Sequence, residues 1–158
     1  MKHIVIIGTK DSGKSETIGA ICKELNPSEI YSIDLKKPSL VEKSLSTKIE
    51  NDTYVIEVDG KYILVAAGAP TEQRKRITDI FKDVTVVLNI PISFMIVARR
   101  SSERSSGFNT IDELNSISEC VHTERIRFIE GTTKDTIKDS AEFKKRIAKL
   151  VSIIKREL

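Results

Sequence analysis

The sequence has too few cysteines for a disulfide scaffold and no apolar run long enough to cross a membrane. Its two cysteines, Cys22 and Cys120, cannot staple a chain of 158 residues, so we expect reduced core thiols in an intracellular protein. No apolar run approaches the roughly 18 residues of a membrane span. The apolar stretch 4–7 is too short for the core of a secretory signal. These shortages predict a soluble, cytoplasmic protein.

An excess of charge of either sign is also lacking. Lys and Arg number 26 against 23 Asp and Glu, which gives a formal net charge of +3. This surplus is far below the basic surface typical of nucleic-acid binding, so nucleic acid is not indicated as a partner. The apolar share of 39% is ample for a core, and the length suits a single domain over residues 1–158.

Strand-like and helix-like segments alternate along the chain, which predicts an α/β domain. Residues 4–7 are wholly apolar and β-branched, as in a parallel strand buried on both faces. Asp59-Gly60, the pair favoured in a type I′ turn, separates two β-rich runs and predicts a hairpin. The expected strands are 4–7, 30–33, 54–58, 61–67, 92–98 and 126–129, and the expected helices are 14–25, 71–89, 110–122 and 139–158. Residues 34–52 are expected to form a mobile loop with one helical turn near 39–45.

The segment 71–89 has two interpretations. Its apolar residues recur at helical spacing from Ile77 to Leu88, whereas the β-branched residues 84–88 would also suit a strand. We favour one long helix, because a strand there would leave too few residues for a crossover. The element order then predicts a three-layer α/β/α sandwich whose sheet is mainly parallel, with one antiparallel edge strand from the hairpin.

One motif carries specific chemistry. Residues 8–15, Gly-Thr-Lys-Asp-Ser-Gly-Lys-Ser, fit G-x-x-x-x-G-K-[ST] at every fixed position, between an apolar strand and a helix. Gly8 and Gly13 allow a tight turn in which successive N–H groups point inward at phosphates, beside the positive end of the helix. Lys14 would reach the β and γ oxygens of a nucleotide, and the Ser15 hydroxyl would ligate Mg²⁺.

On this motif the sequence resembles the P-loop NTPase superfamily, which implies binding of ATP or GTP with Mg²⁺. Other stretches resemble Ras-type small GTPases: Thr47 stands near the place of that family's Mg²⁺-sensing threonine, and residues 128–134 resemble the loop over the guanine base. The hairpin ends at Gly68 like the family's Asp-x-x-Gly, but Val65 replaces the Asp. Residues 99–102, Arg-Arg-Ser-Ser, replace Asn-Lys-x-Asp. The nucleotide contacts that this resemblance implies are Gly8, Asp11, Ser12, Gly13, Lys14, Ser15, Gly131 and Thr132.

Small-molecule and nucleotide kinases of the same superfamily are an open alternative. They often place an Asp at the end of the second strand, where Asp34 stands here, to take the acceptor's proton. They also close an arginine-bearing lid over the phosphates, and Arg99, Arg100 and Arg104 lie in a polar loop suited to that role. The plainer interpretations are that Asp34 caps a turn and that the arginines are solvated.

No apolar strand ends in the Asp that usually provides a second anchor for Mg²⁺. Glu72 and Gln73, just after Gly68, lie where small GTPases carry a water-orienting glutamine, which makes Gln73 a candidate for that role. Three functions therefore stay open. The first is a Mg²⁺-dependent NTP hydrolase, assisted by a protein partner or by its own arginine. The others are a phosphotransferase and a nucleotide-dependent binding module without turnover.

Overall fold

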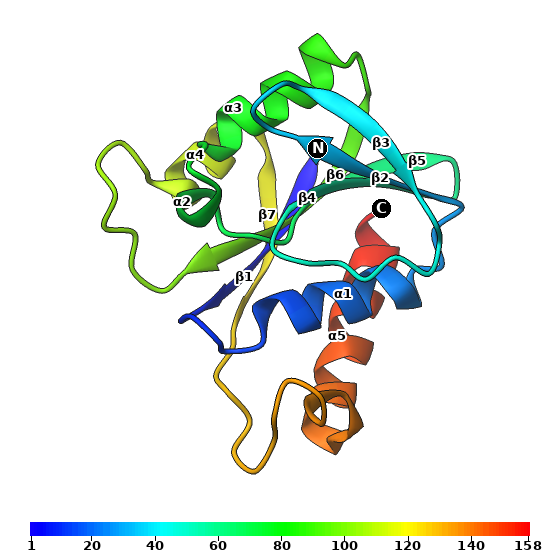
Figure 1. Ribbon diagram of the computed structural model, residues 1–158, viewed down its shortest axis with the longest axis vertical. Helices are drawn as coiled ribbons and strands as arrows, with labels where there is room; N and C mark the ends of the chain where they lie inside the picture. The colour runs from blue at the N-terminus through cyan, green and yellow to red at the C-terminus, as the bar shows by residue number, and fades with distance from the viewer.

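The sheet is organised around β1 (Lys2–Gly8), whose apolar β-branched residues suit a strand buried on both faces. In the computed structural model, which describes residues 1–158, β1 lies between β6 (Ile92–Arg100) and β7 (Glu119–Arg125). The other strands are β2 (Glu29–Asp34), β3 (Ser39–Lys43), β4 (Thr53–Val58) and β5 (Lys61–Ala66). Together they form a seven-stranded sheet in the order β3-β2-β4-β5-β6-β1-β7 (Figure 1).

The sheet is mixed, so the prediction of a mainly parallel sheet was wrong. β1 pairs in parallel with β6 and β7, and β5 pairs in parallel with β6. β2 is antiparallel to both β3 and β4, and β4 is antiparallel to β5. The difference arises because residues 39–43 form a strand, which adds one more antiparallel strand to the sheet. The parallel strands are therefore gathered on one side of the sheet and the antiparallel strands on the other.

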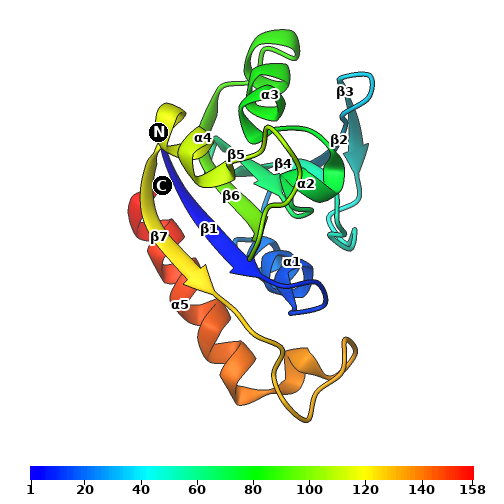
Figure 2. The ribbon, with the colours of Figure 1, turned by 90° about the vertical axis from the view of Figure 1, so that its left-hand side faces the viewer.

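Helices cover both faces of the sheet (Figure 2). α1 (Lys14–Glu24) and α5 (Ala141–Glu157) pack on one face. α3 (Ile77–Lys82), the π-helical turn η1 (Asp83–Val87) and α4 (Thr110–Ile117) pack on the other. Residues of β1 alternate between the two cores, with Ile4 and Ile6 facing α1 and α5 and Val5 and Ile7 facing α3 and α4. Each buried side chain of this kind stabilises the fold by about 1.5–3 kcal/mol.

Several predicted elements are confirmed. The first strand and the helix after it appear as β1 and α1, and the terminal helix appears as α5. The hairpin turn has φ of 52° at Asp59 and 75° at Gly60, the two positive angles that a type I′ turn requires. Cys22 is buried as expected, and burial raises the pKa of its thiol to about 12.

Other predictions were wrong. The helix expected through 122 ends at Ile117, and the last strand is β7, not 126–129. β7 is polar because it is an edge strand whose backbone is satisfied by β1, and it leaves Cys120 exposed. Residues 39–43 form β3, not a helical turn. The expected helix 71–89 is split into α2 (Pro70–Gln73) and α3 with η1, because Arg74 between them has a φ of 57°.

A 3₁₀ turn, η2 (Ile137–Asp139), joins the long segment after β7 to α5. In Figures 1 and 2 this segment, coloured orange, extends past the end of β7 and returns beside α1. No helix in the structure combines the length and the apolar character that crossing a bilayer would need.

Candidate functional site

The carboxyl ends of β1, β5 and β6 lie at one edge of the sheet, because these strands run in the same direction. Open α/β sheets bind ligands in the crevice outside such an edge. Gly8 at the end of β1 pairs with Arg100 at the end of β6. The Ser101 N–H then donates to the Gly8 carbonyl at 3.2 Å, which fixes the loop after β6 beside the loop after β1. The short helix α2, which carries Glu72, follows the end of β5.

The loop of residues 8–15, here called the P-loop, turns where its glycines require it. Gly13 has a φ of 95°, a left-handed angle that most side chains avoid, and a Cβ there would lie 3.0 Å from Ile137 Cδ1. A Cβ at Gly8 would overlap the Ser12 hydroxyl. The Ser12 N–H donates to the Thr9 carbonyl at 3.3 Å. These contacts fold the loop tightly over the N-terminus of α1.

Lys14, on the first turn of α1, folds back over the loop. Its Nζ donates to the carbonyls of Gly8 at 3.0 Å and Thr9 at 2.7 Å, and the residue is only 7% exposed. Burial lowers the pKa of Lys14, the nearby charge of Glu72 raises it, and that of Arg100 lowers it again. The ammonium is thus held at the floor of the loop, within electrostatic reach of one carboxylate and one guanidinium.

The Ser12 hydroxyl has no hydrogen-bond partner although the residue is only 1% exposed. Buried polar groups in folded proteins nearly always have a partner, and leaving one without costs about 1–3 kcal/mol. Ser12 does not line the pocket over the loop, so a ligand oxygen would supply the missing partner by entering the loop itself.

A pocket of about 370 Å³ opens over the P-loop. Besides P-loop residues it is lined by Glu16, Asn51, Glu72, Arg100 and Lys134. Glu72 Oε1 lies 3.4 Å from Arg100 Nη1. Lys134 Nζ lies 3.4 Å from Asp11 Oδ1, which ties the segment after β7 to the P-loop. Four cationic side chains, those of Lys10, Lys14, Arg100 and Lys134, therefore line the pocket together with three carboxylates.

The two hydroxyls predicted to ligate Mg²⁺, those of Ser15 and Thr47, belong to residues that line one pocket of about 530 Å³ beside α1. Ser15 also lines the P-loop pocket, and its hydroxyl donates to Glu16 at 3.2 Å. Mg²⁺ in phosphate sites keeps several waters and takes few protein ligands. One hydroxyl beside a bound phosphate therefore fits it, although no three His, Cys, Asp or Glu side chains gather anywhere to hold a metal.

The predicted base contacts, Gly131 and Thr132, lie near the P-loop but do not line its pocket. Gly131 has a φ of 79°, and the Thr132 N–H and hydroxyl both donate to the Ile129 carbonyl, at 3.2 and 2.5 Å. Of this loop only Lys134 reaches the pocket. The structure brings the loop next to the P-loop, with its hydrogen bonds directed at its own backbone.

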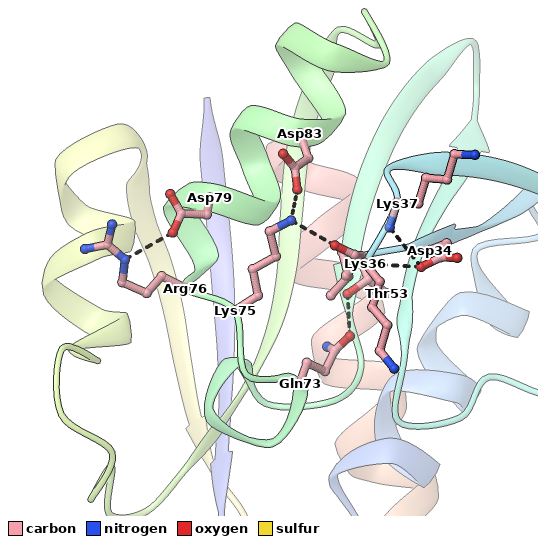
Figure 3. A network of polar contacts seen from close by, with 10 residues as sticks. Asp34, Lys36, Lys37, Thr53, Gln73, Lys75, Arg76, Asp79 and Asp83 are labelled. Carbon is pink, nitrogen blue, oxygen red and sulfur yellow. Dashed lines mark hydrogen bonds and ion pairs between the residues drawn. The ribbon is translucent and has the colours of Figure 1, made fainter.

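Asp34 is not brought to this site. It ends β2, and β4, β5 and β6 lie between β2 and β1, a separation of about 19 Å at ordinary strand spacing. Its Oδ1 accepts the backbone N–H groups of Lys36 at 2.9 Å and Lys37 at 3.3 Å (Figure 3). Asp34 therefore closes the turn between β2 and β3, and this position gives no support to its predicted role as a base.

The arginines predicted as a lid are divided in their roles. Arg99 Nη1 donates to the carbonyls of Arg100 at 2.9 Å and Ser101 at 3.2 Å, and its Nε lies 3.4 Å from Glu103. Those contacts hold Arg99 within its own loop. Arg100 borders the P-loop pocket, and Arg104 borders a second pocket next to it.

Gln73 is also occupied by structure. Its Nε2 donates to the Gly68 carbonyl at 2.6 Å, and its Oε1 accepts the Thr53 hydroxyl at 2.9 Å (Figure 3). Its neighbour Glu72 is the side chain that reaches the pocket. Asn51 also reaches it, which could not be predicted because residues 44–52 have no period or motif. A Cβ at Gly68 would overlap the Asn51 carbonyl, so the two segments touch only because residue 68 is glycine.

No family model matches this chain, and no curated protein or solved structure matches it either.

Proposed function

We propose that the protein binds a nucleoside triphosphate with Mg²⁺ at the P-loop, within a three-layer P-loop NTPase fold. The observation that carries the proposal is the combination of the buried Lys14 ammonium with the unpartnered Ser12 hydroxyl in one glycine-turned loop. Triphosphate oxygens would accept from Lys14, Ser12 and the loop N–H groups. The N-terminus of α1 adds its partial positive charge to these donors.

We further propose that the bound triphosphate is hydrolysed, with Glu72 as the base. Glu72 is the carboxylate that α2 brings to the border of the pocket, where it could take a proton from a water beside the γ-phosphoryl group. Water attacks the γ phosphorus, the bond to the β–γ bridging oxygen breaks, and the proton of the water passes to Glu72. Arg100, released from Glu72, would then stabilise charge on the γ-phosphoryl oxygens.

Mg²⁺ would be held by the Ser15 hydroxyl together with phosphate oxygens, with Thr47 in reach from the adjacent pocket. When bound, it supplies charge neutralisation between the β and γ phosphates. The low number of protein ligands predicts weak Mg²⁺ binding without nucleotide.

Calorimetric titration with ATP and with GTP, each with and without Mg²⁺, tests the binding proposal. Lys14→Ala should weaken triphosphate binding by about 100-fold, because charge-assisted hydrogen bonds to phosphate oxygens are lost. An affinity equal to that of the unaltered protein would contradict the assignment of the P-loop. The order of ATP and GTP affinities shows whether the segment 128–134 favours guanine.

Release of inorganic phosphate under single turnover tests the assignment of Glu72. Glu72→Gln should bind triphosphate within about threefold of the unaltered protein and slow hydrolysis by about 100-fold, the usual contribution of a positioned base. Adding Gln73→Glu to the Glu72→Gln variant should not restore the rate, because the side chain at position 73 is held by Gly68 and Thr53. Tight binding without turnover in the unaltered protein would instead indicate a nucleotide-dependent binding module, which a partner protein reads.

A phosphotransferase is the second candidate, and one observation favours it. A second polar pocket adjoins the first at Glu72 and Arg100, so an acceptor would have room beside the γ-phosphoryl group. In that reaction the acceptor hydroxyl replaces water and Glu72 takes its proton. Acceptor-dependent formation of the nucleoside diphosphate would select this function.

A further inference from the structure

The second pocket is larger than the P-loop pocket and wholly polar. Its volume is about 620 Å³, and no hydrophobic side chain lines it. Lys10, Glu72 and Arg100 border both pockets, so these side chains form a common wall. The volume lies in the range that holds a small metabolite.

The positive charge of this pocket is not balanced within the protein. Lys10, Arg74, Arg100 and Arg104 line it, and Glu72 is its one carboxylate. Glu72 pairs with Arg100, whereas the side chains of Lys10, Arg74 and Arg104 make no ion pair or hydrogen bond. Neighbouring cations without a counter-charge repel one another, and an anion between them would remove that repulsion.

Arg74 is held at the pocket by an unusual backbone. Its φ of 57° is left-handed, and every other non-glycine residue with positive φ in the chain is Asp or Asn, the types that tolerate it. Its two neighbours are anchored, Gln73 to Gly68 and Thr53, and Lys75 to Leu35 and Asp83 (Figure 3). Strained backbone conformations cluster at functional sites. Here the conformation fixes the Cα of Arg74, whose side chain has no partner.

The loop after β6 adds hydroxyl donors to the arginines that it carries. Ser101, Ser102 and Ser105 line the pocket. The loop that carries them is held by Glu103, which accepts the Thr110 backbone N–H at 2.8 Å and pairs with Arg99. The loop therefore brings these hydroxyls to the pocket together with Arg104, while Arg74 comes from the segment after α2.

We infer that this pocket binds the phosphate group of a small phosphate monoester, with Arg74 and Arg104 as its principal partners. A tetrahedral dianion matches forked guanidinium donors and serine hydroxyls together. The site does not depend on nucleotide binding, although it places a phosphorylated substrate across Glu72 from the P-loop.

Titration of the ¹⁵N-labelled protein with inorganic phosphate, at constant ionic strength, tests this inference. Backbone amides of Ser101, Ser102 and Ser105 should shift along one binding curve. The double variant Arg74→Gln, Arg104→Gln should weaken that curve by at least about tenfold, since each charge-assisted hydrogen bond to phosphate is worth about that much. Arg76→Gln is the matched control, because its exposed side chain pairs with Asp79 outside the pocket and should leave the curve unchanged.

Thr9 and Lys10 line the second pocket, so the P-loop site is followed by the amides of residues 12–15, whose separate curve makes loss of the nucleotide site and loss of this site distinguishable. Shifts confined to residues 12–15, or an unchanged curve in the double variant, would overturn the inference. A single-stranded oligothymidylate that displaces phosphate at lower concentration would also overturn it and assign the pocket to nucleic acid. Displacement by a phosphorylated sugar, with the oligonucleotide inert, supports a small monoester.

Discussion

The network around Lys75 and the loop around Lys14 are made of the same kinds of polar groups, but they differ in how far these groups are satisfied. Lys75 Nζ donates to the Leu35 carbonyl at 3.0 Å and pairs with Asp83, and Gln73 uses both ends of its amide (Figure 3). At the P-loop, the Ser12 hydroxyl is buried without a partner. Completed networks hold elements together, whereas incomplete ones mark where a ligand would complete them.

The two regions also lie in different parts of the sheet. The Lys75 network ties the turn after β2 to η1, through Leu35 and Asp83, beside the antiparallel strands. The P-loop follows β1, among the parallel strands whose carboxyl ends share one edge. Parallel strands deliver several loops to one crevice, while hairpins send successive turns to opposite edges. β2 runs in the same direction as β5, so Asp34 also ends at this edge, but three strands separate it from β1 and its carboxylate closes the turn to β3.

Of the variants that compare these two regions, Lys75→Met should produce the largest loss of stability. The Lys75–Asp83 pair is mostly buried, with side chains 24% and 17% exposed, so removal of the ammonium leaves a carboxylate without its partner. We expect a loss of about 2 kcal/mol in the free energy of unfolding, below the 3–5 kcal/mol of a fully buried pair. Urea unfolding measures the loss, and nucleotide affinity should change less than threefold.

Arg76→Met is the control, because the Arg76–Asp79 pair is about half exposed, at 52% and 45%. Exposed pairs contribute about 0.5 kcal/mol or less. Equal losses in the two variants would show that the Lys75 network contributes no more than a surface pair. The Lys75 network could then no longer be contrasted with the ligand site as a network that stabilises the fold.

The sequence predicted those parts of the fold whose signal is local. The run 4–7, the helix after the P-loop and the Asp59-Gly60 turn each carry their pattern within a few residues, and each is confirmed. β7 was missed because its polar residues depend on pairing with β1 and not on their own alternation. Arg74 interrupts the expected long helix because its φ is positive, and no residue pattern in this segment predicts that angle. Strand order is likewise a property of the whole sheet.

The same division applies to the site. The P-loop motif pointed to Lys14 and Ser15 because its chemistry requires fixed spacing, whereas Ser12 stands at one of its variable positions. Glu72 and Arg100 meet across the pocket from α2 and β6, and only the tertiary structure shows that Gln73 and Arg99 beside them are already occupied. Adjacent residues in a sequence differ in role when one side chain turns to the backbone and the other to the crevice.

Replacing a single serine in each region should change stability by a smaller amount, and the two replacements should have effects of opposite sign. Ser140 caps α5, and its hydroxyl accepts the Phe143 N–H at 3.1 Å, so Ser140→Ala should cost about 1 kcal/mol of stability.

Ser12→Ala removes a buried hydroxyl with no partner and keeps the Cβ, so it should stabilise the nucleotide-free protein by about 1 kcal/mol. The same change should weaken triphosphate binding by about three- to tenfold, because a phosphate oxygen then loses its hydroxyl donor. Thermal unfolding with and without nucleotide measures both effects. A Ser12→Ala protein that is destabilised like Ser140→Ala would mean that the Ser12 hydroxyl is satisfied without a ligand, and the strongest sign of a phosphate site in this loop would be lost.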